Sequence, residues 1–334
     1  SWVPHIPLAK ERLDVGPGVF GLALLAIAAG AVTAMPLTGA MINRYGSSRV
    51  SLVTGALFCI AFAGPVTAPT LVPFIIMGYL LGALIGSMDV AMNAHGIAVE
   101  RKLKSPIMSM LHGGFSVGGM VGAFLGAWAL QHMDEFTHIA LAGAACLILL
   151  FIAVRFLLPR SIDKGLSDTH FGWPTRATIG LGLLCFLALM AEGSVLDWSA
   201  ISFTAEFKVD AGTAGLGYAF FSGGMAASRF TGDWLRQKFG AVPMVVASAL
   251  LTAVSIALAV SVSSFVTAVV AFTFAGIGIG NIAPVLFAGG GRLEPDAPGR
   301  GIAAVTTLGY AGFLAGPPLI GFAAEVTSLG HAFW

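Results

Sequence analysis

The sequence predicts an all-α protein whose chain crosses a membrane many times. Three observations favour this fold class: 57% of the 334 residues are hydrophobic, only 10% are charged, and the mean hydropathy is +0.90. Soluble domains carry about 25% charged residues, so this balance excludes an ordinary soluble fold. The apolar runs lack the alternation of a barrel strand, and a bilayer core of about 30 Å takes roughly 20 apolar residues as a helix.

Ten apolar runs are long enough to be spans, and the short connections between most of them predict antiparallel neighbours. Cys59, Cys146 and Cys185 all fall inside these runs, where a thiol packs as a small apolar group. We therefore expect neither a disulfide framework nor a metal site. The predicted spans are 18–42, 50–66, 71–98, 107–129, 139–158, 177–197, 211–232, 241–260, 265–288 and 301–321.

The basic residues predict the orientation in the membrane. Of the 17 Lys and Arg residues, only Lys10, Arg12 and Lys208 lie on one side. The other side is cytoplasmic by the positive-inside rule, and we expect a bacterial inner membrane with both chain ends outside. A net charge of +1 without a basic cluster among aromatic residues excludes nucleic acid as a partner. The 14 cytoplasmic residues are Arg44, Arg49, Arg101, Lys102, Lys104, Arg155, Arg160, Lys164, Arg176, Arg229, Arg236, Lys238, Arg292 and Arg300.

An internal repeat divides the chain into two homologous halves. We expect helix bundles at 1–158 and 177–334, joined by a polar cytoplasmic linker at 159–176. One span precedes the second copy of the repeat, but none precedes the first, and the chain stops where a last span is due. We therefore expect ten spans of an original twelve, with the first and last missing; the alternative is a natural ten-span protein. The matched landmarks are Trp2 with Trp198, Gly21 with Gly217, Gly46 with Gly240, and Gly126 with Gly321.

This arrangement resembles the major facilitator superfamily, in which parallel repeats surround a central site and rock to alternate its access. Residues 39–46 resemble the family's signature loop between its second and third helices, with Asn43 where an acid is usual. The resemblance implies that this loop and its counterpart in the second half help to hold the transporter in an inward-closed or outward-open state. The alternative is that both are ordinary positively charged turns that set topology. The implied gating residues are Gly39, Asn43, Arg44 and Gly46 in the first loop, and Arg229, Asp233, Arg236 and Gly240 in the second.

Two acidic residues, Asp89 and Glu192, lie deep inside predicted spans. A carboxylate in hydrocarbon costs about 2.5 to 3.5 kcal/mol, so an intramembrane acid indicates a functional site by default. Asp89 lies about 12 residues from Arg101, or roughly 18 Å along a helix, which places it near the midplane. Glu192 is expected in the outer half of its span. We predict that both exchange protons with a central cavity; the alternative for Glu192 is a buried structural role.

Polar and aromatic side chains in the spans are candidate solute ligands. Asn93 follows Asp89 by four residues and shares its helical face. For Asn281 the alternative is an interhelical hydrogen bond, for His112 polar packing, and for the aromatic rings core packing. Asp197 and Trp198 are expected at the external boundary as ordinary interface residues. The candidate ligands are Asn93, Asn281, His112, Phe115, Tyr218 and Phe221.

Two motifs extend the family resemblance. Asp89 with Asn93, and Pro284 with Phe287 in the segment GNIAPVLFAGG, resemble the fucose permease-like branch of the superfamily. That likeness implies that Asp89 is the acid that binds a proton or a sugar. The opening Trp-Val-Pro-x-Ile-Pro and the core Asp-Val-x-Met-Asn also resemble uncharacterised bacterial permeases.

These observations predict a monomeric secondary transporter, a symporter that couples protons to the import of a small polar, sugar-like solute. The alternative is proton-antiport efflux of an amphiphilic compound. We expect no enzyme and no cofactor, because neither His-Glu-x-x-His nor an evident nucleophile and base pair occurs. No phosphate-binding Gly-x-x-x-x-Gly-Lys-Ser/Thr motif is present to power a pump. A transport-dead sensor would need a signalling partner that the short linker does not suggest.

Overall fold

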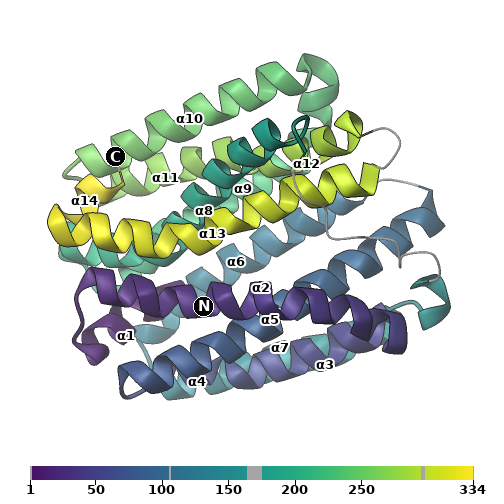
Figure 1. Ribbon diagram of the computed structural model, residues 1–334. Helices are drawn as coiled ribbons and strands as arrows, with labels where there is room; N and C mark the ends of the chain where they lie inside the picture. The colour runs from purple at the N-terminus through teal and green to yellow at the C-terminus, as the bar shows by residue number, and fades with distance from the viewer. Residues whose placement is uncertain (1, 105–106, 164–174, 295–297, 334) are drawn as a thin grey trace.

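The computed structural model describes residues 2–104, 107–163, 175–294 and 298–333. In this part of the chain every regular element is a helix (Figure 1). The N-terminal half contributes η1 Val3–His5, α1 Ile6–Leu13, α2 Pro17–Tyr45, α3 Ser47–Ala61, α4 Ala63–Thr67, α5 Leu71–Leu103, α6 Met108–Leu130, α7 Glu135–Ala153, η2 Val154–Phe156 and η3 Arg160–Asp163. The C-terminal half contributes α8 Ile179–Phe207, α9 Ala211–Phe239, α10 Ala241–Ser261, α11 Phe265–Ile279, α12 Ile282–Leu293, α13 Pro298–Val326 and α14 Leu329–Ala332. Most of the predicted linker, 164–174, lies outside the described residues.

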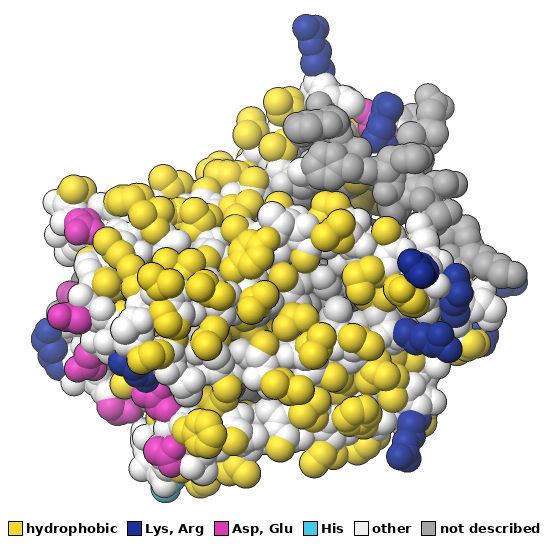
Figure 2. All heavy atoms as spheres, turned by 60° about the horizontal axis from the view of Figure 1, so that its bottom comes forward, with side chains coloured by type: hydrophobic (Ala, Val, Ile, Leu, Met, Phe, Trp, Pro, Cys, Tyr) yellow, Lys and Arg dark blue, Asp and Glu magenta, His cyan; other side chains and the backbone are white. Residues whose placement is uncertain are grey.

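The outer surface confirms an all-α membrane protein. Nine helical segments in the described part are long and apolar enough to cross a membrane. The remaining predicted span, 211–232, lies in α9. This helix is as long as α2 and contacts α6 and α11, but it carries more charged residues. Hydrophobic side chains cover the middle of the molecule, while Lys and Arg gather at one end and most Asp and Glu at the other (Figure 2). This is the charge distribution that the positive-inside rule requires.

The two halves repeat in one register of 194 residues. Helices α2 and α9 both contain 29 residues, and Gly46 and Gly240 end them with φ of 89° and 88°. Helices α5 and α11 begin at Leu71 and Phe265, which are also 194 positions apart. The predicted match of Trp2 with Trp198 is two positions out of this register. In the structural register Trp198 corresponds to Pro4, so the two tryptophans are not equivalent.

The predicted gating loops are helical, which corrects the sequence interpretation. Helix α2 continues through Tyr45 and α9 through Phe239, so the segments 39–45 and 229–239 are the last turns of helices. A single glycine makes each reversal, because only glycine adopts a positive φ near 90° without strain. Each chain reversal therefore takes place at a single glycine, Gly46 or Gly240, and not over the longer loop that the sequence predicts.

Helix α8 also differs from its predicted span. It continues to Phe207, ten residues past the predicted end, because the added turns bury an apolar face. Trp198 is 0% exposed and meets Phe20 of α2 edge to face, with ring centroids 6.1 Å apart. Trp198 therefore packs in the protein core and does not belong to an exposed aromatic belt. The longer helix moves Glu192 from the outer half of its span to near the middle.

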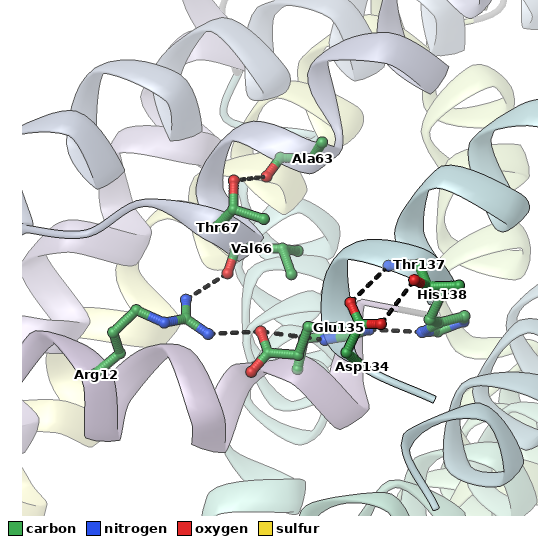
Figure 3. Close-up of polar contacts among 9 residues, drawn as sticks. Arg12, Ala63, Val66, Thr67, Asp134, Glu135, Thr137 and His138 are labelled. Atoms are coloured by element: carbon green, nitrogen blue, oxygen red, sulfur yellow. Dashed lines mark hydrogen bonds and ion pairs between the residues drawn. The ribbon is translucent and has the colours of Figure 1, made fainter. Parts of the chain in front are cut away.

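A polar network at the external end ties the first segment of the chain to its own half (Figure 3). Arg12 Nη2 lies 2.5 Å from Glu135 Oε2 at the start of α7, and Arg12 Nη1 donates to the Val66 carbonyl of α4. The buried ring of His5 shares a hydrogen bond of 2.8 Å with His138 of α7. These contacts hold η1 and α1 against α4 and α7.

Aspartates cap two helices at this external end. Asp134 accepts hydrogen bonds from the Thr137 amide and hydroxyl at 3.0 and 2.6 Å, and Asp210 accepts the equivalent pair from Thr213 at 2.9 and 2.6 Å. The hydrogen bonds from Thr137 hold the pKa of the Asp134 carboxyl below its usual range. Both α7 and α9 therefore begin with a cap from their own half.

Glycines set the closest helix contacts, and they do so at equivalent places in both halves. A Cβ on Gly82 of α5 would lie 1.7 Å from the Ile27 carbonyl oxygen of α2. A Cβ on Gly276 of α11 would lie 2.0 Å from the Phe221 carbonyl oxygen of α9. Small residues let helix backbones approach closely in lipid. The α2–α5 and α9–α11 crossings therefore depend on these glycines.

We expect Gly82→Ala and Gly276→Ala each to lower the free energy of unfolding by about 1 to 3 kcal/mol, because the added methyl group overlaps backbone. Denaturant unfolding of the purified protein in detergent measures this. Gly118→Ala in α6 is the matched control, since its Cβ would meet nothing within 4 Å. A loss at Gly118 as large as that at Gly82 would contradict the packing argument.

Candidate functional site

Asp89 lies between the two halves, on α5, and its carboxylate has partners from both. The Tyr310 hydroxyl of α13 donates to Oδ2 at 3.1 Å, and Asn93 Nδ2 donates to Oδ1 at 3.0 Å. The Asn93 bond is local, since the two residues are one turn apart on α5. The Tyr310 bond joins the N-terminal half to the C-terminal half at mid-membrane depth.

Arg229 of α9 is buried and carries the second part of the site. Its side chain is 9% exposed, and its Nη2 lies 3.4 Å from Glu192 Oε1 of α8. Its Nε donates to the Gly280 carbonyl at 3.1 Å, where α11 ends, and its Nη1 donates to Ser116 Oγ of α6 at 2.6 Å. The guanidinium therefore contacts two elements of its own half, α8 and the end of α11, and α6 of the other half.

The two parts form one cluster. The carboxylates of Asp89 and Glu192 both interact electrostatically with the Tyr310 hydroxyl. The Arg229 guanidinium interacts in the same way with the His112 ring. A second contact reinforces the junction, because the Ser222 hydroxyl of α9 donates to the Ser116 carbonyl at 2.8 Å. The site therefore lies where α5 and α6 meet α8, α9 and α13.

The charges of this cluster are unequally partnered. Arg229 is neutralised by Glu192, whereas Asp89 receives hydrogen bonds only from the uncharged groups of Tyr310 and Asn93. In the described part of the chain no cation pairs with Asp89. An ionised Asp89 would thus be uncompensated, and two partners could balance it: a proton or a cationic solute.

Comparison with known proteins decides the family. The profile of the Major Facilitator Superfamily matches residues 3–177 and 181–334, nearly the whole chain. The chain belongs to the major facilitator superfamily. It is 36% identical to an uncharacterised MFS-type transporter of Yersinia pestis over 338 residues, covering 100% of this chain and 87% of the relative. It is 30% identical to the membrane protein MosC of Rhizobium meliloti over 342 residues, covering 99% and 81%.

Solved structures share the superfamily fold. A mutant of the nucleoside transporter NupG superposes with a TM-score of 0.75 at 13% identity, covering 99% of this chain and 90% of that one. A bacterial homolog of the human lysosomal transporter Spinster, inward-facing and occupied, gives 0.70 at 14% identity, covering 97% and 78%. As a superfamily member, the protein is an integral membrane transporter of a small-molecule solute and not an enzyme. Its bacterial relatives point to the plasma membrane. The fucose permease-like branch stays a prediction.

The predicted solute ligands separate into two groups in this superfamily fold. Asn93 and His112 lie in the cluster, and the His112 carbonyl is 3.4 Å from Arg229 Nη1. Asn281 lies outside the cluster and is buried. Its Nδ2 donates to the Ser228 hydroxyl at 2.7 Å, and its side chain fills the space beside Gly232. This geometry favours the interhelical alternative for Asn281.

The predicted aromatic ligands have different environments. Phe221 is fully buried and packs edge to face on Phe272, with centroids 6.4 Å apart, which favours the core alternative. Tyr218 packs beside Phe221 and is half-buried. Phe115 of α6 is 57% exposed, so it does not belong to the core.

The predicted gating residues lie at the cytoplasmic ends of α2 and α9, except Arg229. Asn43 uses its carbonyl to accept a 2.8 Å hydrogen bond from Arg160 of η3, and Arg44 lies over the Tyr45 ring. Arg229 was predicted to be cytoplasmic, and the structure corrects this. It lies eleven residues before Gly240, the equivalent of Gly46, and inside the helix, because Glu192 and Ser116 supply partners for its side chain. Asp233 is exposed at the same end of α9.

Sequence reasoning missed Tyr310 and Ser116. Tyr310 lies in the predicted span 301–321 and is one of only four tyrosines, a signal that could have singled it out. Ser116 had no such signal, because serine is common in membrane helices. For Arg229 the signal was its position inside the predicted span 211–232.

We expect Arg229→Ala to lower the free energy of unfolding by about 3 to 5 kcal/mol, because it leaves the Glu192 charge buried without a partner. The double variant with Glu192→Gln should recover a large part of that loss. Denaturant unfolding in detergent gives both values. The pair Arg300 and Glu294, 3.1 Å apart, is the control, because the Arg300 side chain is 55% exposed, and Arg300→Ala should cost about 1 kcal/mol or less. Equal losses at Arg229 and Arg300 would rule out a buried ion pair.

Proposed function

We propose that this protein is a proton-coupled symporter that imports a small polar solute, with Asp89 as the coupling acid. The observation that carries the proposal is the 3.1 Å hydrogen bond between Asp89 and Tyr310, which joins the two halves. Because Tyr310 and Asn93 are uncharged, Asp89 can gain or lose a proton without breaking an ion pair. Each such change alters a contact between the halves, and a difference in contacts between two states is what shifts their populations.

Glu192 has a different role in this proposal. Its pairing with Arg229 supports the structural alternative, in which Glu192 holds the guanidinium against Ser116 and the end of α11. The groups left for a solute include the Asn93 amide, the Tyr310 hydroxyl and the His112 ring. These groups hydrogen-bond hydroxyls, which suits a sugar-like solute. We propose that the protein acts as a monomer in the bacterial inner membrane.

The alternative is a proton antiporter that exports an amphiphilic compound. Asp89 has no cationic partner among the residues that the structure describes, and this favours one form of the antiporter. In that form an amine-bearing solute pairs with the ionised acid and exchanges for a proton. Direction separates the two functions in vesicles. Solute added outside should acidify the lumen in a symporter and make it more alkaline in an antiporter.

A ligand screen identifies the solute. Thermal unfolding of the full-length protein is measured against sugars, small metabolites and amphiphilic amines at two pH values, since a ligand that binds the folded state raises Tm by mass action. We expect a sugar-like ligand to give a larger rise at the lower pH. A rise that is the same at both pH values would contradict proton coupling.

In proteoliposomes, we expect Asp89→Asn to abolish solute accumulation driven by a proton gradient and to spare solute counterflow. The amide has the same shape and still accepts one hydrogen bond at its oxygen, but it does not ionise. Glu206→Gln, an exposed acid at the end of α8, is the control and should accumulate solute as the wild type does. Undiminished uphill uptake by Asp89→Asn would remove Asp89 from the coupling mechanism.

A further inference from the structure

The external end of α13 reaches across to the other half and caps α2. The Glu325 carboxylate of α13 accepts a hydrogen bond of 2.7 Å from the Gly18 amide, in the first turn of α2. The residue that precedes α2 is Gly16, which has no side chain to cap the helix. The first-turn amides of a helix favour an anionic partner, so the C-terminal half supplies a cap that the N-terminal half lacks.

Close backbone packing surrounds this contact. A Cβ on Gly18 would lie 2.3 Å from Glu325 Oε2, and one on Gly21 would lie 2.6 Å from the Pro317 carbonyl oxygen. From the opposite side, a Cβ on Gly321 would lie 2.5 Å from the Pro17 carbonyl oxygen. The external ends of α2 and α13 thus touch without intervening side chains. Glu325 itself is exposed, so protons from outside can reach it.

The equivalent contact in the other half carries no ionisable group. In the 194-residue register Glu325 corresponds to Gln131, at the end of α6. Gln131 Nε2 lies 3.5 Å from Thr213 Oγ1 in the first turn of α9, and α9 is capped by its own Asp210. At both junctions the side chain at the equivalent position contacts the first turn of a helix in the other half. Only at the α2–α13 junction is that side chain an acid.

We propose that Glu325 is an external proton-binding site that controls the opening of the transporter to the outside. When ionised, Glu325 holds α2 and α13 together. When it binds a proton, it loses its charge attraction to the start of α2, and the external ends separate more readily. The proposal goes beyond the coupling role of Asp89 and does not depend on it.

Other ionisable groups lie on the elements that pack against this end of α13. They are Asp14 ahead of α2, Asp197 and Glu206 on α8, and His331 on α14. His331 shares a hydrogen bond of 2.8 Å with Ser328. Among the described residues none of these four contacts Glu325, whose polar partner is the Gly18 amide.

Electron-electron distance measurements between two spin labels test the proposal without a solute. The labels are placed on Glu11→Cys in α1 and Thr327→Cys after α13, two exposed external positions, in full-length protein with its own cysteines replaced. The pH is lowered from about 7.5 to about 4, which is below the reference pKa of about 4.3 for a glutamate in a model peptide. We expect a longer-distance population to grow severalfold. In Glu325→Gln that population should be present at both pH values and no longer respond to pH.

Two controls make the result specific. Gln131→Ala removes the equivalent neutral contact and should leave the pH response as in the wild type. Asp89→Asn should also keep the response, which separates this site from the proposed coupling acid. The proposal is overturned if Glu325→Gln responds to pH as the wild type does, or if Asp89→Asn alone removes the response.

Discussion

A guanidinium buried between two helix bundles needs a partner for each of its donors, and Arg229 is the residue on which this constraint acts. In the bilayer no water replaces a missing hydrogen bond. Glu192 neutralises the charge, and the end of α11 and Ser116 of α6 take the remaining donors. The break between α11 and α12 leaves the Gly280 carbonyl free to accept one of these bonds. One buried charge thus fixes where α8, α9 and α11 meet and how α6 lies against them.

The repeat gives the two halves the same architecture but different chemistry. Helix pairs cross in the same way, and each crossing is joined by a polar contact: Thr38 with Ser87 at 2.9 Å in one half and Ser228 with Asn281 at 2.7 Å in the other. In the 194-residue register, however, Asp89 corresponds to Ala283. The acid is therefore present once, and the symmetric scaffold carries an asymmetric site.

Composition and periodicity were sufficient to predict the fold class, the helical spans and the repeat, because burial in lipid dictates long apolar runs whatever the tertiary contacts. Asp89 could be found for the same reason, since a carboxylate inside such a run is costly. Its partner could not be found, because Tyr310 lies 221 positions away and no local pattern links them. Arg229 shows a further limit. Counting charges placed it in the cytoplasm, whereas the acid that keeps it buried lies on another helix.

Helix α13 connects the central cluster with the external end. Tyr310 and Glu325 are 15 residues apart on it, roughly 22 Å along the axis, and each contacts the other half. Pro317 and Pro318 lie between them and lack the amide hydrogens that would complete the helical ladder. Bending α13 at this point therefore costs fewer hydrogen bonds than elsewhere. The outer part can leave Gly18 while the inner part keeps its contact with Asp89, so that the two contacts need not break in the same step of the transport cycle.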